Sequence, residues 1–289
     1  MTRPGRVFAV VNQKGGVGKT TTAVNLAASL AASERATLLV DLDPQANASS
    51  AYGIHGASPQ IYDALVGSRV MKEMTHATEL RYLHLVPSGR DLYGAEIELV
   101  SAISRERRLE RMLDEIRDDY EIVLVDCPPS LGLLTLNALT AADGVLIPLQ
   151  CEYYALEGLA GLLDTVALVR RELNPGLALE GLLLTMADSR NRLSSQVEQE
   201  VRGHFGEQVF RTVIPRNVRL SEAPSHGKPI LLYDVRSTGA IAYLDLAAEL
   251  LRRLPAPATP VEPPSPAFPL PSAPTSPVIP SEAPEGESA

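Results

Sequence analysis

A glycine-rich run with two lysines, residues 14–20, is the first stretch whose residue types and spacing suggest chemistry. Its glycines let consecutive backbone N–H groups converge on phosphate oxygens, and a helix that follows adds positive potential at its N-terminus. We expect Lys19 to neutralise the β- and γ-phosphates of a nucleotide and the Thr20 hydroxyl to bind Mg²⁺. The other expected phosphate contacts are Gly15, Gly16, Val17, Gly18 and Thr21.

This loop departs from the pattern Gly-x-x-x-x-Gly-Lys-Thr at one position, because Gln13 stands where the first glycine is expected. Lys14 is a second lysine, five residues before Lys19, at the mouth of the loop. Its position is poorly suited to phosphates held by its own loop. It predicts contact with the nucleotide of a facing copy, in the manner of an arginine finger. The alternative is a solvated surface lysine.

Two hydrophobic runs end in carboxylates, one at Asp41 and Asp43 and the other at Asp126. Alternation along a strand places Asp41 and Asp43 on the same side. We expect Asp41 to anchor the phosphate loop and the Mg²⁺ shell, and Asp43 to orient the attacking water. Asp126 is expected to act on Mg²⁺ through a bound water or through Thr20. For each carboxylate, the alternative is a cap at the end of a strand.

The runs that carry these residues predict the fold class. Short apolar segments alternate with helical patterns, which indicates a doubly wound, mostly parallel α/β sheet with helices on both faces. The expected strands are 7–11, 37–40, 82–86, 122–125, 145–149 and 179–184. The expected helices are 19–33, 105–118, 132–141, 156–171, 194–205 and 239–253. Ligands of such sheets bind beyond the carboxyl ends of the strands, where all of these motifs fall.

Together the motifs resemble the ParA/Soj family, the DNA-partitioning ATPases with a deviant Walker A motif. The resemblance covers residues 6–252 and rests on segments 12–22, 40–45, 126–130, 150–158 and 214–225. It implies an ATP-dependent sandwich dimer in which Lys14 acts in trans and Asp43 is needed for hydrolysis. It further implies that Pro215 and Asn217 contact adenine.

The resemblance also implies DNA binding without sequence preference, through Arg190 and Arg219. Arg192, Arg216 and Lys228 are weaker candidates for the same surface, and a solvated arginine is the alternative for each predicted contact. A dimer doubles the phosphate contacts on one surface, so ATP would switch on DNA binding by creating the dimer. The implied partner is a ParB/Spo0J-type centromere-binding protein that stimulates hydrolysis, and the implied location is the nucleoid.

The composition of the chain disfavours several other classes of function. The net charge is −9 and there is no tryptophan, which disfavours a basic coat or aromatic stacking of bases. The sequence lacks an apolar run of membrane-spanning length and a signal-peptide layout, and a reducing cytoplasm fits its two cysteines. No helix-turn-helix is expected before the first strand, which disfavours operator-specific repression and favours the compact, chromosomal type.

The sequence predicts one ATPase domain, residues 1–254, followed by a tail. Residues 255–289 hold 12 of the 23 prolines, four glutamates and no lysine or arginine. Such a segment is expected to be disordered, since it has little apolar surface to bury. A Pro-rich docking peptide is the alternative.

Three other functions remain open at this point. A MinD-like membrane-associated ATPase shares the deviant loop but needs a basic amphipathic C-terminal helix. An iron–sulfur relative of nitrogenase iron protein needs two suitably placed cysteines, whereas Cys127 and Cys151 begin different loops. A nucleotide-gated scaffold that does not hydrolyse ATP is disfavoured by Asp43, Lys19 and Thr20.

Overall fold

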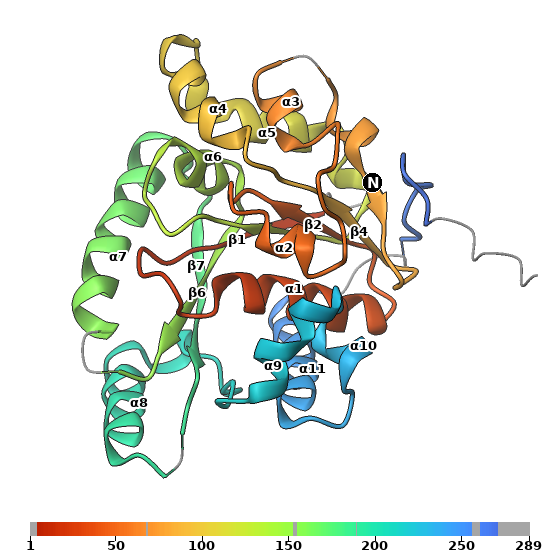
Figure 1. Cartoon of the computed structure of the whole chain (residues 1–289). Coiled ribbons are helices and arrows are strands. Elements are labelled where there is room, and N and C mark those ends of the chain that lie inside the picture. The colour runs from red at the N-terminus through yellow and green to blue at the C-terminus, as the bar shows by residue number, and fades with distance from the viewer. Residues whose placement is uncertain (1–4, 68, 153–154, 189, 256–260, 271–289) are drawn as a thin grey trace, which may run out of the picture.

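The computed structural model describes residues 5–67, 69–152, 155–188, 190–255 and 261–270. A seven-stranded sheet forms its centre, in the order β3-β4-β2-β5-β1-β6-β7 (Figure 1). Neighbouring strands are parallel except β3 and β4, which are antiparallel. The predicted doubly wound α/β class is therefore confirmed. The strands are β1 (Arg6–Val10), β2 (Thr37–Asp41), β3 (His76–Ala77), β4 (Leu83–Val86), β5 (Ile122–Asp126), β6 (Gly144–Gln150) and β7 (Ala178–Thr185).

Helices cover both faces of this sheet (Figure 1). On one face lie α1, α9, α10 and α11, and on the other lie α3 to α8. The helices are α1 (Lys19–Ala32), α2 (Asn47–Ser50), α3 (Ile61–Leu65), α4 (Leu92–Glu98), α5 (Arg108–Asp114), α6 (Leu133–Ala141), α7 (Ala155–Glu172), α8 (Arg192–Phe205), α9 (Val218–Glu222), α10 (Ile230–Tyr233) and α11 (Thr238–Arg253).

The central strands are apolar on both sides because each side belongs to a different core. In β1, Val7 and Ala9 pack into the core beneath α5 to α7, while Phe8 and Val10 pack into the core beneath α1 and α11. Successive side chains of a strand point to opposite faces, so a strand between two helical layers needs a continuous apolar run. Such runs made six of the seven described strands predictable from the sequence.

Parallel pairing brings the ends of three strands together. Val10 of β1 pairs with Asp126 of β5, and Asp41 of β2 pairs with the other side of Asp126. The phosphate loop leaves β1 at this point and leads into α1. Two carboxylates and the glycine-rich loop therefore meet at the carboxyl edge of the sheet, where ligands of this fold class bind.

The edge formed by β3 differs from the sequence expectation. Residues 261–270, inside the tail predicted to be disordered, lie beside it, and Phe268 forms a parallel bridge with His76 (Figure 1, blue segment beside β4). Phe268 is the one aromatic residue of the tail, and its ring stacks on that of His76 at a centroid distance of 4.4 Å. The sequence did not predict this contact, because a proline-rich segment with one aromatic residue shows no strand pattern.

Candidate functional site

The phosphate loop has the backbone shape that its glycines predict. Gly16 has a φ of 74° and Gly18 a φ of 91°, which are left-handed conformations that side-chain-bearing residues avoid. Gly18 caps α1, and its carbonyl accepts the first helical hydrogen bond, 2.8 Å from the Thr22 nitrogen. The loop therefore ends at a helix N-terminus, the arrangement that favours a bound phosphate.

Thr185 of β7 and Asn12, two residues after β1, hold this loop in place, and neither had a predicted role. The Thr185 hydroxyl donates to the Val17 carbonyl at 2.8 Å. The Asn12 side-chain amide donates to the Pro148 carbonyl at 2.7 Å and accepts from the Lys14 nitrogen at 2.9 Å. Thr185 and Pro148 are far in the sequence from the residues that they contact, and Asn12 is an ordinary loop residue by type. No local sequence pattern therefore predicts these hydrogen bonds.

The Lys19 side chain is buried beneath the phosphate loop and not exposed to solvent. Its side chain is buried, and its ammonium group donates to the Lys14 carbonyl at 3.0 Å. Burial lowers the pKa of Lys19, while the nearby carboxylates of Asp126 and Asp43 act in the opposite direction. A phosphate group placed in the loop would give this buried ammonium a directly bonded anionic partner.

Asp126 is the least satisfied buried group of the site. Neither of its carboxylate oxygens has a hydrogen-bond partner, and the residue is fully buried. Burial raises its pKa well above the ordinary value and the neighbouring Asp41 adds to this effect. The Thr20 hydroxyl and the Lys19 ammonium oppose the increase, although Thr20 approaches without a hydrogen bond of good geometry. A buried carboxylate beside a threonine hydroxyl is a fitting environment for a divalent cation.

Asp41 is the last residue of β2 and Asp43 follows the strand, and Asp41 has different contacts from those predicted. The strand ends at Asp41, so period-two alternation does not extend to Asp43. Asp41 accepts from the Ser49 nitrogen at 2.8 Å and from the Ser49 hydroxyl at 2.7 Å, and burial raises its pKa to about 6 against those bonds. It anchors the segment that follows β2 and not the phosphate loop.

Asp43 remains near the phosphate loop. It is buried, it raises the pKa of Lys19, and one of its carboxylate oxygens accepts from the Gln45 nitrogen at 2.9 Å. The Ser88 hydroxyl holds its carbonyl at 2.8 Å. Among the described residues, no side-chain hydrogen bond involves the second carboxylate oxygen, and the role of Asp43 in orienting water stays a prediction.

The Lys14 side chain contacts a residue outside the phosphate loop. Its ammonium group pairs with Glu152 at 3.0 Å, and both side chains are about half exposed. The other Glu152 oxygen accepts from the Gln150 amide at 2.5 Å. Glu152 belongs to a motif that the sequence analysis used for the family resemblance, but it had no assigned role there.

The predicted adenine residues, Pro215 and Asn217, lie in the segment between α8 and α9. Pro215 forms a bridge with Ala187 and lines a hollow of about 470 Å³ together with residues of α8 and α11. Asn217 caps α9 by accepting from the Arg219 nitrogen at 2.8 Å, and its amide donates to Thr238 at 2.7 Å. The cap explains why an asparagine suits this position without any ligand.

The predicted DNA contacts, Arg190 and Arg219, are exposed but already paired with carboxylates. Arg190 forms two hydrogen bonds of 2.9 Å with Asp188, and these bonds lower the pKa of Asp188 to about 2. Arg219 pairs with Glu222 at 2.8 Å and with Asp234 at 3.6 Å.

The three weaker candidates for DNA contact, Arg192, Arg216 and Lys228, differ in whether they form an ion pair. Lys228 pairs with Glu79 at 3.6 Å. Within the described ranges, the side chains of Arg192 and Arg216 have no ion pair. The sequence could not distinguish free from paired cations, because the pairing depends on how the loops fold.

The cysteines do not form a metal centre in the described part of the chain. Cys127 and Cys151 are both buried, and burial raises the pKa of each thiol. No cluster of three or more histidine, cysteine or acidic side chains with the arrangement of a metal site occurs among the described residues. Neither thiol has the exposed, electropositive environment of a reactive cysteine.

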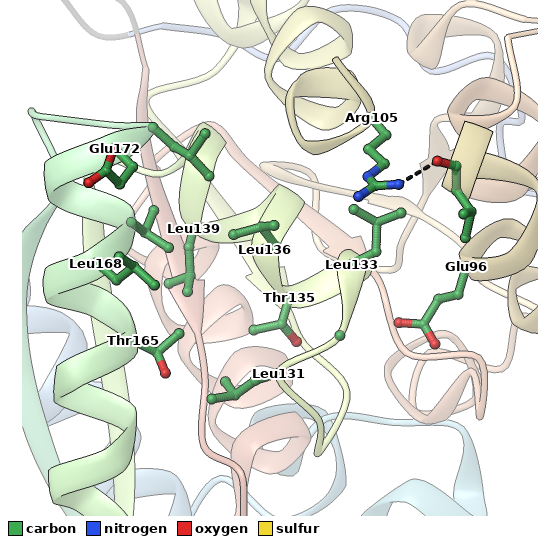
Figure 2. A pocket seen from close by; sticks show the side chains of 14 residues that line it. Glu96, Arg105, Leu131, Leu133, Thr135, Leu136, Leu139, Thr165, Leu168 and Glu172 are labelled. Atoms are coloured by element: carbon green, nitrogen blue, oxygen red, sulfur yellow. Dashed lines mark hydrogen bonds between the residues drawn. The ribbon is translucent and has the colours of Figure 1, made fainter. Parts of the chain in front are cut away.

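A second hollow, of about 670 Å³, lies on the opposite face of the sheet from α1, between α6 and α7 (Figure 2). Leucine side chains from both helices line it, and Glu96, Arg105 and Glu172 lie at its rim. Arg105 is held by the Val100 carbonyl. The hollow is mainly apolar and lacks the glycine-rich backbone of the phosphate loop, so it is not part of the nucleotide site.

Comparison with known proteins shows which family the chain resembles. Residues 5–179 match a family model described as an AAA domain. The chain is 59% identical over 251 residues to the chromosome partitioning protein ParA of Myxococcus xanthus, which covers 86% of this chain and 89% of that protein. It is 57% identical over 248 residues to the sporulation initiation inhibitor protein Soj of Bacillus subtilis, covering 85% and 98%.

A solved structure has the same architecture. It is a protein from Mycobacterium smegmatis described as a cobyrinic acid a,c-diamide synthase with a bound ATP analogue and magnesium. It is 39% identical, with a TM-score of 0.76, and the match covers 86% of this chain and 95% of that one. Together with the phosphate loop and the two relatives, this shows that the chain belongs to the ParA/Soj family of chromosome-partitioning ATPases.

Proposed function

We propose that the protein is a Mg²⁺-dependent ATPase that forms a sandwich dimer with ATP, binds DNA non-specifically as that dimer, and releases it after hydrolysis. The observation that carries the proposal is the buried pair of Lys19 and Asp126, of which the carboxylate is unpartnered. A phosphate chain with its divalent cation supplies the charges that both groups lack. The bound ATP analogue and magnesium of the M. smegmatis protein support this choice of ligand.

Each residue of the phosphate edge has a role in this proposal. The backbone of Gly15 to Gly18 binds the phosphates, Lys19 neutralises the β- and γ-phosphates, and Thr21 contacts the α-phosphate. Thr20 and Asp126 hold Mg²⁺, which neutralises charge on the transferred phosphoryl group when it is bound. Asp43 positions the attacking water and need not be a strong base, because the transition state is loose.

Lys14 acts on the nucleotide of the facing copy. In the single chain its ammonium group is held by Glu152, so the dimer must open this ion pair. Both side chains are about half exposed, and an ion pair of this kind contributes about 1 kcal/mol or less. The cost of freeing Lys14 is therefore small compared with the gain from placing its charge beside a second triphosphate.

Adenine binding is proposed at Pro215 and Asn217. Pro215 lines the hollow beside α8 and α11, and an apolar ring there suits the face of a base. The Asn217 amide donates to Thr238, so base recognition would require this donor to exchange partners.

DNA binding is proposed through Arg190 and Arg219 of both copies. Each guanidinium pairs with a carboxylate of its own chain, and DNA phosphates must compete with those partners. One chain therefore gains little from DNA at cellular salt, while two chains on one rigid surface gain roughly twice as much. Such a protein would associate with the nucleoid in the cytoplasm, and a ParB/Spo0J-type partner would trigger hydrolysis.

The membrane-associated alternative has less support. Its anchor would be a C-terminal amphipathic helix, but the apolar face of α11 is buried, with Leu246 and Leu250 in the core shared with α1. Among the described residues, no helix has both the length and the apolar character needed to span a membrane. In this proposal residues 1–254 form the ATPase domain and residues 255–289 its C-terminal tail.

The first test separates association from hydrolysis. We expect Asp43→Ala to form dimers with ATP and to bind DNA, while its phosphate release falls at least about a hundredfold, because only the water loses its orienting group. Sizing with ADP, ATP and a non-hydrolysable analogue, with and without DNA, measures association and DNA coupling together. Asp43→Asn is the matched control, since it retains an acceptor for the Gln45 nitrogen. Wild-type chains that stay single with ATP and Mg²⁺ would contradict the proposal.

The second test concerns the lysine that acts in trans. We expect Lys14→Ala to bind ATP as the wild type does but to lose the ATP-dependent dimer, because the facing nucleotide loses its partner charge. Equilibrium binding of a fluorescent ATP analogue, followed by sizing, separates the two steps. Glu152→Gln is the matched control, since it breaks the same ion pair but leaves Lys14 free to cross the interface. Normal turnover in Lys14→Ala would exclude the role in trans.

A further inference from the structure

The edge strand β3 is covered by the chain's own tail. On its inner side β3 pairs with β4, and on its outer side the Thr75 carbonyl and the Ala77 nitrogen face away from the sheet. The Phe268 nitrogen donates to the Thr75 carbonyl at 2.9 Å, and the Phe268 carbonyl accepts from the Ala77 nitrogen at 2.8 Å. These two bonds flank His76 in the pattern of a parallel strand pair. The tail thus satisfies the backbone groups that the sheet leaves open.

Side chains fasten the tail at both ends of this contact. The rings of Phe268 and His76 are stacked, with 13° between their planes, and the Ala267 nitrogen donates to the Thr75 hydroxyl at 3.1 Å. Further back, Glu262 pairs with Arg81 at 3.2 Å. Contacts at positions 262, 267 and 268 define one direction along the edge, so the segment has a specific register.

The outer side of the docked segment cannot extend the sheet further. Next to Phe268, the outward-facing position 269 is a proline and has no N–H group. On the other side, the Ala267 N–H group is already bonded to Thr75. Three more prolines, at 263, 264 and 266, precede the contact. Natural sheets use proline in this way to stop their edges from pairing with other chains.

Chain length shows which copy supplies the segment. Six residues, 255–260, separate Leu254 from Val261, and they span at most roughly 20 Å when fully extended. A tether this short gives the segment an effective concentration near its own edge on the order of millimolar. Docking within one chain therefore prevails over exchange between chains.

We propose that residues 261–270 are a strand cap that closes the β3 edge and prevents a second copy of the chain from pairing there. The exposed groups of an uncapped edge, the Thr75 carbonyl and the Ala77 nitrogen, match the same groups of another uncapped copy. Self-association through this edge would be independent of nucleotide, and distinct from the ATP-dependent dimer. The cap thus keeps assembly under the control of the phosphate edge.

The test uses the full chain without nucleotide. In Phe268→Ala we expect the Ala77 amide to exchange hydrogen at least about tenfold faster than in the wild type, because the strand pair opens. We also expect the sedimentation coefficient of this variant to rise with protein concentration. Leu270→Ala, a change at an exposed position two residues further on, is the matched control and should resemble the wild type. Phe268→Tyr retains the stacked ring and should also resemble it.

Two results would overturn the proposal. One is an Ala77 amide that stays as protected in Phe268→Ala as in the wild type, which would show that the tail does not close the edge. The other is an unprotected Ala77 amide in a chain that sediments as the wild type does at every concentration. ATP hydrolysis in dilute solution confirms that the variant is folded, since the cap touches no residue of the phosphate edge.

Discussion

Two buried polar regions of this sheet differ in how well their groups are satisfied. At the phosphate edge, Asp126 has no hydrogen-bond partner and Lys19 has only a backbone carbonyl. Near the β3 edge, His84 of β4 is equally enclosed, but its ring nitrogen is 2.9 Å from the Tyr120 hydroxyl and the two rings meet edge to face. The first region leaves a buried carboxyl group without a hydrogen-bond partner, and the second pairs its neutral groups.

The difference indicates what each region does. Unpaired buried charge costs stability, and a fold retains it where a ligand completes the set. Paired neutral groups hold the sheet together and require no ligand. We therefore expect substitutions at the phosphate edge to change turnover more than stability, and substitutions around His84 to do the opposite.

The largest expected effect is that of Asp126→Asn on stability and turnover. A loss of stability in this variant, in place of the expected gain, would contradict the comparison. Asp126→Asn removes a buried carboxylate that has no partner, so we expect the nucleotide-free chain at pH 8 to gain about 1 kcal/mol in unfolding free energy. We expect turnover with ATP and Mg²⁺ to fall by about a thousandfold, because the cation loses its buried carboxylate. Urea unfolding and phosphate release measure the two effects.

A control for this variant is Asp119→Asn, which changes a partly exposed aspartate that pairs with Lys72 at 3.2 Å. It should change neither quantity by much, since a surface ion pair contributes little. If Asp126→Asn reduced the unfolding free energy as much as the substitution of a hydrogen-bonded core residue does, the phosphate edge would have a structural role. The contrast between the two regions would then disappear.

The second prediction concerns His84 and acid. Burial lowers its pKa to about 4, whereas a histidine in the unfolded chain has a pKa of about 6.5. Between these values the unfolded chain binds more protons than the folded one. The unfolding free energy should therefore fall by up to about 3 kcal/mol as the pH decreases from about 6.5 to about 4. This contribution is fully present above pH 6.5.

His84→Gln removes this titration. We expect a shallower decrease in stability below pH 6.5, together with a loss of about 1 kcal/mol at pH 7 from the Tyr120 hydrogen bond. Denaturant unfolding at a series of pH values gives both numbers. The exposed residue His55 is the control, as His55→Gln should leave the acid slope unchanged. ATP turnover that fell along with stability would place His84 in the functional region after all.

The smallest effect sharpens the comparison at the surface. Arg190 and Arg219 are exposed and their carboxylate partners are partly exposed, so a DNA phosphate can replace these partners, whereas the buried His84 pair is closed to solvent. Replacing either arginine with alanine should reduce the salt dependence of DNA binding by about two phosphate contacts per dimer and weaken binding equally for all sequences. Binding titrations over a range of salt, with ATP present, measure this.

The matched control here is Arg171, an exposed arginine of α7 that also pairs with an adjacent carboxylate, Glu172, at 2.6 Å. Arg171→Ala should leave the salt dependence unchanged. If it matched Arg190→Ala, DNA binding would reflect total charge and not a defined surface.

Much of the site was predictable because it depends on local chemistry. The glycines and lysines of the phosphate loop, Asp43 and Asp126 all follow apolar runs that become central strands, and parallel strands bring such ends to one edge. The roles of Asp41 and Glu152 were not predictable. Asp41 accepts a hydrogen bond from Ser49 across a turn, and strand alternation does not predict the path of a turn. Glu152 pairs with Lys14, which is 138 residues away in the sequence.

By itself, the sequence determined the fold class, the family and the residue types that gather at the phosphate edge, because these depend on residue type and short-range periodicity. Only the tertiary structure decided which of those residues have hydrogen-bond or ion-pair partners. It left Asp126 unpartnered, paired Arg190 and Arg219, and brought Phe268 to the β3 edge. Pairing depends on the distance between groups far apart in the chain, and that distance exists only after folding.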